Sequence, residues 1–481
     1  MKKFILPFFL ISFALSQWTV NEKLFLDIEA DFLSFLPNRN PAYLNNEVMP
    51  YSYAFTYRYD NNAGDYRLPF TPSGKSYQNI AVSAFREMKS GVIFAGRFAY
   101  RYEQRKDKKW LHNAENHLHI PFYFADSSTG DFILNGIDWN MLFSYPLSKN
   151  IHAGLNIFYN VDEQFKSVFP KPNIKRNSVH IHPALAFSAE HSRLGLRGSF
   201  FQYKQDMDTK RYRLEQGKTP TFMRIHGLDK PLMTYAKTSE ERLQNIRGWG
   251  LSADMDLARI LMFKTNYEYA KTDITDGGAY PVPQGRWDIT RFYYRADLYP
   301  GCKANLFFQQ QISRSEGFHP DLDRRIYARS YRQSKGGLTI PYRQSNGEMW
   351  SGTVSYAFEE VKREDNFLGL LDYFPSNSLY LGMRYDHERK FLQYGFNIAY
   401  ENIDVGQEII YNDITGWYYT EITEKEIAYY RQDRRKISAS LRLLFPLGSN
   451  QFEISASCTA VRPKNIAKSY HFAQTRLTML F

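Results

Sequence analysis

The chain has 481 residues and a formal net charge of +11, with 43% hydrophobic, 17% aromatic and 23% charged residues. Its 36 Tyr and 37 Phe provide ample surface to bury, which excludes an intrinsically disordered chain. No stretch approaches the roughly 20 apolar residues of a membrane-spanning helix, which excludes a helical membrane protein. The two cysteines, Cys302 and Cys458, are too few and too distant for a zinc motif or a disulfide scaffold, so no metal site can rest on them. We expect no cofactor.

Residues 1–16 have the pattern of a signal peptide. Lys2 and Lys3 form a basic start, residues 4–15 form an apolar core, and Ala14 and Ser16 are the small residues that a signal peptidase recognises. The core is too short to span a bilayer. We expect cleavage before Gln17 and export of the mature chain; the alternative is a buried N-terminal strand or helix.

Residues 17–50 form a separate N-terminal segment. Its apolar residues recur at helical spacing, Thr19 with Glu22 matches a capping box, and Pro37 ends the pattern. These apolar residues are Leu24, Phe25, Ile28, Phe32, Phe35 and Leu36. Because an apolar stripe of this size must be buried, we expect a short helical plug or lid that docks on the domain that follows.

Residues 51–481 repeat segments of about ten residues in which apolar and polar side chains alternate, the period of a β-strand. A secreted β-sandwich would alternate as well. Three further features favour a membrane barrel: aromatic residues gather toward strand ends, short and long connections alternate, and an aromatic residue, Phe481, closes the chain on the same face as Leu477 and Met479.

We therefore predict an all-β fold: a transmembrane antiparallel β-barrel with a short N-terminal helical plug or lid. Both termini should be periplasmic, which requires an even strand number. An added strand around residues 337–342 brings the count to 18, with 16 and 14 as alternatives. Long extracellular connections are expected around residues 104–130, 206–246, 314–336 and 402–434.

The stretch Asn40, Pro41, Ala42 before the first strand resembles one near the N-terminus of fatty-acid-transporter-like barrels and of the Bacteroidota barrels related to them. The Tyr-rich, long-looped chain as a whole resembles the uncharacterised Bacteroidota outer-membrane barrels that accompany TonB-dependent receptors. The first resemblance implies an N-terminal hatch. The second implies an uptake role beside another outer-membrane protein such as a TonB-dependent receptor.

Five histidines are candidate ligand-binding residues: His112, His117, His119, His180 and His182. His180 and His182 are two apart on a strand and share its lumenal face, opposite Val179 and Ile181. We expect all five near the extracellular rim, where imidazoles could bind a transition metal or haem iron. The alternative is that they are ordinary polar residues, and we expect no tightly held metal.

Charged residues form two groups. The lumenal arginines and carboxylates nearly cancel, which argues against an ion-selective ring and favours a ladder of cross-strand pairs. The surplus positive charge lies in the expected loop 314–336, as Arg324, Arg325, Arg329 and Arg332. We expect these arginines to contact lipid head groups, lipopolysaccharide phosphates or an acidic ligand. Nucleic acid is not an expected partner.

No serine-elbow, zincin or phosphate-loop spacing is present, so the sequence does not predict an enzyme. The expected location is the bacterial outer membrane, with loops at the cell surface. The predicted function is a transport or uptake channel, or an accessory to an uptake complex. The alternative is a non-conducting structural or assembly partner of another outer-membrane complex.

Overall fold

The computed structural model describes residues 40–42, 53–112, 121–210, 222–227, 231–233, 239–258, 260–299, 304–320, 324–343, 348–366, 369–389, 392–411, 419–447, 450–464 and 468–480. The expected signal peptide, the expected N-terminal helix and all of the expected segment 17–50 except residues 40–42 lie outside these ranges. Within them, no helix is both long enough and apolar enough to span a membrane.

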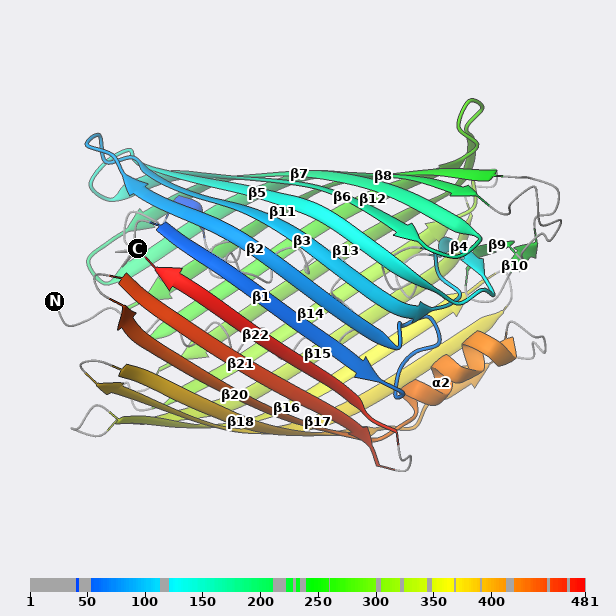
Figure 1. Cartoon of the computed structure of the whole chain (residues 1–481). Coiled ribbons are helices and arrows are strands. Elements are labelled where there is room, and N and C mark those ends of the chain that lie inside the picture. The colour runs from blue at the N-terminus through cyan, green and yellow to red at the C-terminus, as the bar shows by residue number, and fades with distance from the viewer. Residues whose placement is uncertain are drawn as a thin grey trace.

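Eighteen antiparallel strands form the wall of a closed barrel, in which the first strand pairs with the last (Figure 1). This confirms the predicted barrel of 18 strands over the alternatives of 16 and 14. The wall strands are β1 (Tyr53–Gly64), β2 (Gly74–Glu87), β3 (Ile93–Lys108), β5 (Gly130–Pro146), β6 (Ile151–Lys166), β7 (Lys171–Ser188), β8 (Ser192–Lys210), β11 (Ser239–Leu257), β12 (Leu261–Asp276), β13 (Val282–Leu298), β14 (Asn305–Phe318), β15 (Arg325–Arg343), β16 (Glu348–Asp365), β17 (Leu370–Arg389), β18 (Leu392–Val405), β20 (Arg434–Leu447), β21 (Asn450–Pro463) and β22 (Tyr470–Leu480).

The two ends of the barrel differ. At the end where β1 begins and β22 ends, the connections are short; we call this the short-turn end. The opposite, long-loop end carries a separate sheet of β4 (Phe122–Asp126), β9 (Phe222–His226) and β10 (Pro231–Met233). It also carries the short strand β19 (Ile409–Tyr411), which pairs with β17. A π-helical turn, η7 (Tyr419–Thr423), and the helix α2 (Glu424–Tyr430) lie at the same end.

One predicted long connection is wrong. Residues 314–336 belong mostly to strands, because β14 continues to Phe318 and β15 begins at Arg325, which leaves only residues 319–324 between them. Side chains on this part of β15 still alternate, with Tyr327, Arg329 and Tyr331 buried on the lumenal face. Polar and charged residues on both faces hide this strand from a search for apolar alternation.

The outer face has a membrane-facing band. On β7, Val179, Ile181, Leu185 and Phe187 point outward and are exposed, while the even-numbered residues between them point into the lumen. Toward the short-turn end, aromatic side chains such as Trp350 contact their neighbours on the outer face, as in the aromatic girdle of a membrane barrel. The exterior is therefore that of a transmembrane wall.

The lumenal wall contains the predicted mixture of charges, paired in two ways. Glu268 and Arg291 face each other across β12 and β13, with 2.9 Å between Oε1 and Nη1. Other pairs, such as Arg295 with Asp297 at 2.7 Å, are two residues apart on one strand rather than on neighbouring strands. The expected pairing is thus confirmed, but the expected cross-strand ladder describes only part of it.

Candidate functional site

Segments from three connections meet inside the long-loop end and form what we call the cap: residues 109–112 and 121–129, residues 222–227 with β10, and residues 419–433. β4 and β9 pair antiparallel at its centre, from Phe122 opposite His226 to Asp126 opposite Phe222. All five residues of β4 are buried. A strand that is buried on both faces needs no alternation, which explains the apolar run at residues 122–125.

One face of the β4–β9 pair contacts the barrel wall. Phe124 and Phe222 form a buried cluster with Ile174 of β7 and Met207 of β8. The opposite face belongs to a second cluster, which joins the cap to the β1–β2 connection and to η7. Its buried members are Leu68, Phe70, Trp110, Leu111, Tyr123, Ala125, Met223, Ile225 and Ile422. The cap therefore has its own apolar core, which depends on segments from distant parts of the chain.

A first buried ion cluster fixes the cap to β6. Lys166 Nζ lies 3.0 Å from both carboxylate oxygens of Asp126 and donates to the carbonyl oxygen of Ser128, also at 3.0 Å. His112 hydrogen-bonds to the same carboxylate. Burial lowers the pKa of His112 despite the attraction of Asp126, which favours a neutral imidazole. Burial alone would raise the pKa of Asp126, but His112, Lys166 and Ser128 lower it to about 2, so the carboxylate stays ionised at neutral pH.

A second cluster fixes β9 to β11 and β12. Arg224 lies 2.6 Å from Glu240 and 3.4 Å from Asp276, and Arg242 lies 2.6 Å from Asp276. The Arg242 guanidinium also lies 3.8 Å from the centre of the Phe124 ring, a cation–π contact. Burial and the charge of Arg242 lower the pKa of the neighbouring His226 to about 4.

A third cluster fixes α2 to β16 and β17. Arg363 is 1% exposed and donates to Glu426 of α2 at 2.8 Å and to Asp372 of β17 at 2.7 Å. Burial raises the pKa of Glu426, against the opposing effect of Arg363. The Tyr430 ring contacts Phe374 of β17, with 5.3 Å between centroids. Charged groups on opposite sides of the wall thus hold the cap from β6 through β12 to β17.

Two glycines show how closely the cap approaches the remaining wall. A Cβ atom on Gly285 of β13 would lie 2.3 Å from the Phe122 ring, and one on Gly317 of β14 would lie 2.7 Å from Pro121. No side chain fits at either position without displacing the cap. The cap therefore reaches across the mouth, from β6 to β14, rather than lining one side of it.

A separate feature lies near the short-turn end, far from the cap. There Asn40, Pro41 and Ala42 dock on the lumenal wall, and we call these three residues the anchor. Asn40 Nδ2 donates to two backbone carbonyls, of Leu185 on β7 at 2.8 Å and of Leu196 on β8 at 3.0 Å. Its Oδ1 accepts from the Ala42 amide at 3.0 Å.

The anchor is closely fitted to its seat. Ala42 is fully buried against Ala184 and Ala186, and Ser144 donates to its carbonyl at 3.2 Å. A Cβ atom on Gly154 would lie 2.3 Å from the Ala42 nitrogen, so glycine is required there. Residues 40–42 are thus fixed at the lumenal surface.

The predicted histidines do not meet at one rim. His112 lies in the cap, and His117 and His119 lie outside the described residues. His180 and His182 do face the lumen, with ring centroids 6.1 Å apart, and His180 stacks on Phe201.

Their expected position near the extracellular end is wrong, because they lie in the middle of β7. Lys166 of β6 contacts the cap, and Phe158, the register partner of His180, lies eight residues before it on the same strand. His180 is therefore about 27 Å along the strand from the level of Lys166. In the described ranges, no group of three or more His, Cys, Asp and Glu side chains is placed to hold a metal ion. A ligand-binding role for these histidines stays a prediction.

The four predicted arginines also separate. Arg324 precedes β15, and Arg325, Arg329 and Arg332 lie within it, so their placement in one loop is wrong. Arg329 is buried on the lumenal face, whereas Arg325 and Arg332 are exposed and pair with Glu316 and Glu360, at 3.1 and 4.0 Å. Their ligand-binding role stays a prediction.

Several residues that build the cap were missed by reasoning from the sequence: Asp126, Lys166, Arg224, Arg242, Arg363 and Glu426. The available signal was an apolar run at residues 122–125 and three apolar residues around Arg224 at residues 222–225, inside stretches expected to be polar loops.

Comparison with curated protein sequences finds no match. Among solved structures, the ferric preacinetobactin receptor BauA from Acinetobacter baumannii has 8% identity and a TM-score of 0.39, over 90% of this chain and 80% of that one. The outer membrane transporter YddB from Escherichia coli has 7% identity and a TM-score of 0.40, over 90% and 81%. FpvA from P. aeruginosa has 8% identity and a TM-score of 0.43, over 88% and 71%. Residues 41–481 match the model of a family of unknown function, DUF6850, and the chain therefore belongs to that family.

Proposed function

We propose that this protein is a non-enzymatic outer-membrane uptake barrel whose lumen is closed at both ends until a ligand or partner opens it. The observation that carries the proposal is the cap, held inside the long-loop end by three buried ion clusters. Barrels of 16 to 18 strands leave an aqueous channel unless something fills it. A fixed internal cap is such a filling. Since long loops of outer-membrane barrels face outward, the cap would face the cell surface.

The anchor supports a second closure at the periplasmic side. It attaches the chain before residue 40 to the lumenal wall of β7 and β8. The helix expected at residues 24–36 is joined to the anchor by three residues, so it would remain at this end. We propose that it forms the plug or lid.

Planar-bilayer conductance tests the proposal. The intact protein should conduct poorly, and removal of residues 18–40 alone should have a small effect, because the cap remains. Lys166→Met, Arg224→Met and Arg363→Met together, which remove the cation that joins the cap to the wall in each of the three clusters, should also have a small effect as long as residues 18–40 are present. The two changes together should give stable conductance steps of the size expected for an 18-strand barrel.

A combined variant that folds but stays silent would reject the uptake proposal. It would favour the alternative, a non-conducting structural partner of another outer-membrane complex, such as one with a TonB-dependent receptor. Heat-modifiable migration on gels should be used to establish folding of each variant.

A further inference from the structure

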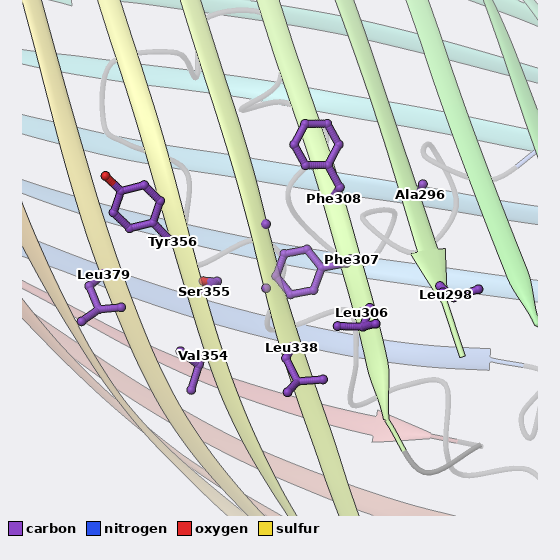
Figure 2. A pocket seen from close by; sticks show the side chains of 12 residues that line it. Ala296, Leu298, Leu306, Phe307, Phe308, Leu338, Val354, Ser355, Tyr356 and Leu379 are labelled. Carbon is purple, nitrogen blue, oxygen red and sulfur yellow. The ribbon is translucent and has the colours of Figure 1, made fainter. Parts of the chain in front are cut away.

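The outer surface of the barrel has a hollow of about 780 Å³ over β14, β15 and β16. Gly336 and Gly337 are among the residues that line it, and Figure 2 shows the larger side chains around it. Phe308 and Tyr356 form its two sides, and Leu306, Leu338 and Val354 extend it toward the short-turn end. These side chains lie on the membrane-facing side of the wall, whereas Phe307, Gly337 and Ser355, which also line the hollow, form a register row of the lumenal face.

The sides of the hollow are held in place. The Tyr356 hydroxyl donates to Asn377 of β17 at 2.6 Å, and the Phe308 ring contacts Tyr294 of β13, with 5.8 Å between centroids. The hollow exists because Gly336, which stands between these two rings in the strand register, has no side chain. It is therefore part of the folded wall.

The outward residues next to the hollow change from apolar to cationic toward the long-loop end. Each step along the strands is two residues, or about 7 Å. In that direction, the rows across β14, β15 and β16 are Leu306, Leu338 and Val354; Phe308, Gly336 and Tyr356; Gln310, Ser334 and Phe358; Ile312, Arg332 and Glu360; and Arg314, Ser330 and Lys362. Three cations, Arg314, Arg332 and Lys362, thus lie about 13 to 20 Å beyond the hollow.

Two of these cations have acidic neighbours. Lys362 pairs with Glu364, and Arg332 lies 4.0 Å from Glu360, whose carboxylate also accepts from Tyr373. Arg314 has no ion-pair partner among the described residues. Gln310 and Ser334, hydrogen-bonded at 2.9 Å, fill the row between the cations and the aromatic side chains. Toward the long-loop end this face thus carries three cations together with the carboxylates of Glu360 and Glu364, and only Arg314 of the three cations lacks an acidic partner in the described part of the chain. Gln310 and Ser334 follow, and the apolar side chains lie toward the short-turn end.

We propose that this face binds a phosphate-bearing, acylated lipid of the outer leaflet. The head-group phosphate would contact Arg332 and Arg314, because guanidinium groups bind phosphate oxygens through charge-assisted hydrogen bonds. One acyl chain would run past Gln310 and Ser334 and lie between Phe308 and Tyr356 on Gly336. The hollow opens to the membrane and the cations lie toward the long-loop end, so head and tail have the orientation of an outer-leaflet lipid. This proposal rests on the orientation of the barrel in the membrane and not on whether its lumen opens.

Binding of purified diphosphorylated lipid A to the full-length protein in detergent, measured by native mass spectrometry and titration, tests the proposal. Gly336→Leu should weaken binding at least tenfold. Its new Cβ would have its nearest neighbours at 3.7 and 3.8 Å, so the side chain fits the fold and fills the hollow. Gly352→Leu is the matched control, because Gly352 is an outward glycine of β16 outside the hollow, with nothing within 4 Å of a new Cβ.

Arg314→Gln with Arg332→Gln should also weaken binding at least tenfold, whereas Lys271→Gln, at an exposed cation on β12 paired with Asp273, should not. Dephosphorylated lipid A should bind weakly to the wild type, with an affinity close to that of lipid A for the double variant. Inorganic phosphate should not compete with lipid A for the wild type. Equal binding by Gly336→Leu and Gly352→Leu, equal binding of the two lipids, or competition by phosphate alone would overturn the proposal.

Discussion

Lys166→Met is expected to weaken the docking of the cap on the barrel wall. Lys166 is 1% exposed, and it is the cation within salt-bridge distance of the equally buried Asp126. Removal of one partner of a buried ion pair costs roughly 3 to 5 kcal/mol, because the other charge stays buried without compensation. Asp126 would keep its hydrogen bonds from the Ser128 amide, at 2.7 Å, and from His112, which places the cost near the lower limit. About 3 kcal/mol corresponds to a roughly 100-fold shift of the docking equilibrium.

Hydrogen exchange at the backbone amides of β4 and β9 measures this equilibrium, because local opening governs exchange of buried amides. Exchange there should become about 100-fold faster, while exchange in the wall strands far from the cap should not change. Lys204→Met, at an exposed pair with Asp206 on β8, is the control and should have little effect. Asp126→Asn added to Lys166→Met should restore slow exchange, because it removes the stranded charge. An unchanged rate in Lys166→Met, or no recovery in the double variant, would refute the electrostatic account of cap docking.

Three further predictions concern the cap, the anchor and the loops. The pKa of His226 is about 4 with the cap docked, against 6.5 for an exposed histidine. Between these two values the released cap binds more protons than the docked cap, so docking should weaken as pH falls from 6.5 to 4. Exchange of β9 measured against pH should show this, and His226→Gln should flatten the profile. Asn40→Ala removes both hydrogen bonds to the wall and should weaken docking of the anchor by about 1 to 3 kcal/mol, which faster proteolysis of the N-terminal segment would show. Gly154→Val should have the same effect, because its side chain would occupy the position of Ala42. Unchanged protection from protease in both variants would contradict the anchor. In intact cells, trypsin should cleave at Arg324 but not at the buried Arg329, and cleavage confined to the short turns would invert the orientation.

The strand pattern of the wall could be predicted because the pleat fixes which side chains share a face. Val179 and Ile181 outside, with His180 and His182 inside, follow from alternation alone. The position of His180 and His182 along the barrel axis could not be predicted in the same way. Alternation continues past the membrane boundary, and nothing in the sequence of β7 marks how far each residue lies from the rim. The first half of β15 was missed for another reason, because polar and charged residues stand on both of its faces.

The cap could not be predicted because its contacts join residues far apart in the chain. Phe122 pairs with His226, and Glu426 with Arg363, and neither partner carries a local signal for the other. The anchor is an intermediate case. Its residues stood out through a resemblance, but two of its acceptors are backbone carbonyls, of Leu185 and Leu196, which only the strand register brings together.

The central sheet of the cap is built from two connections rather than one. β4 comes from the β3–β5 connection and β9 from the β8–β11 connection, with four wall strands between them in the chain. Neither connection can leave the mouth alone without breaking the hydrogen bonds between β4 and β9, so the two connections should move as one cooperative unit. A crosslink that fixes either connection to the wall should therefore immobilise both, and a label on one should report the position of the other.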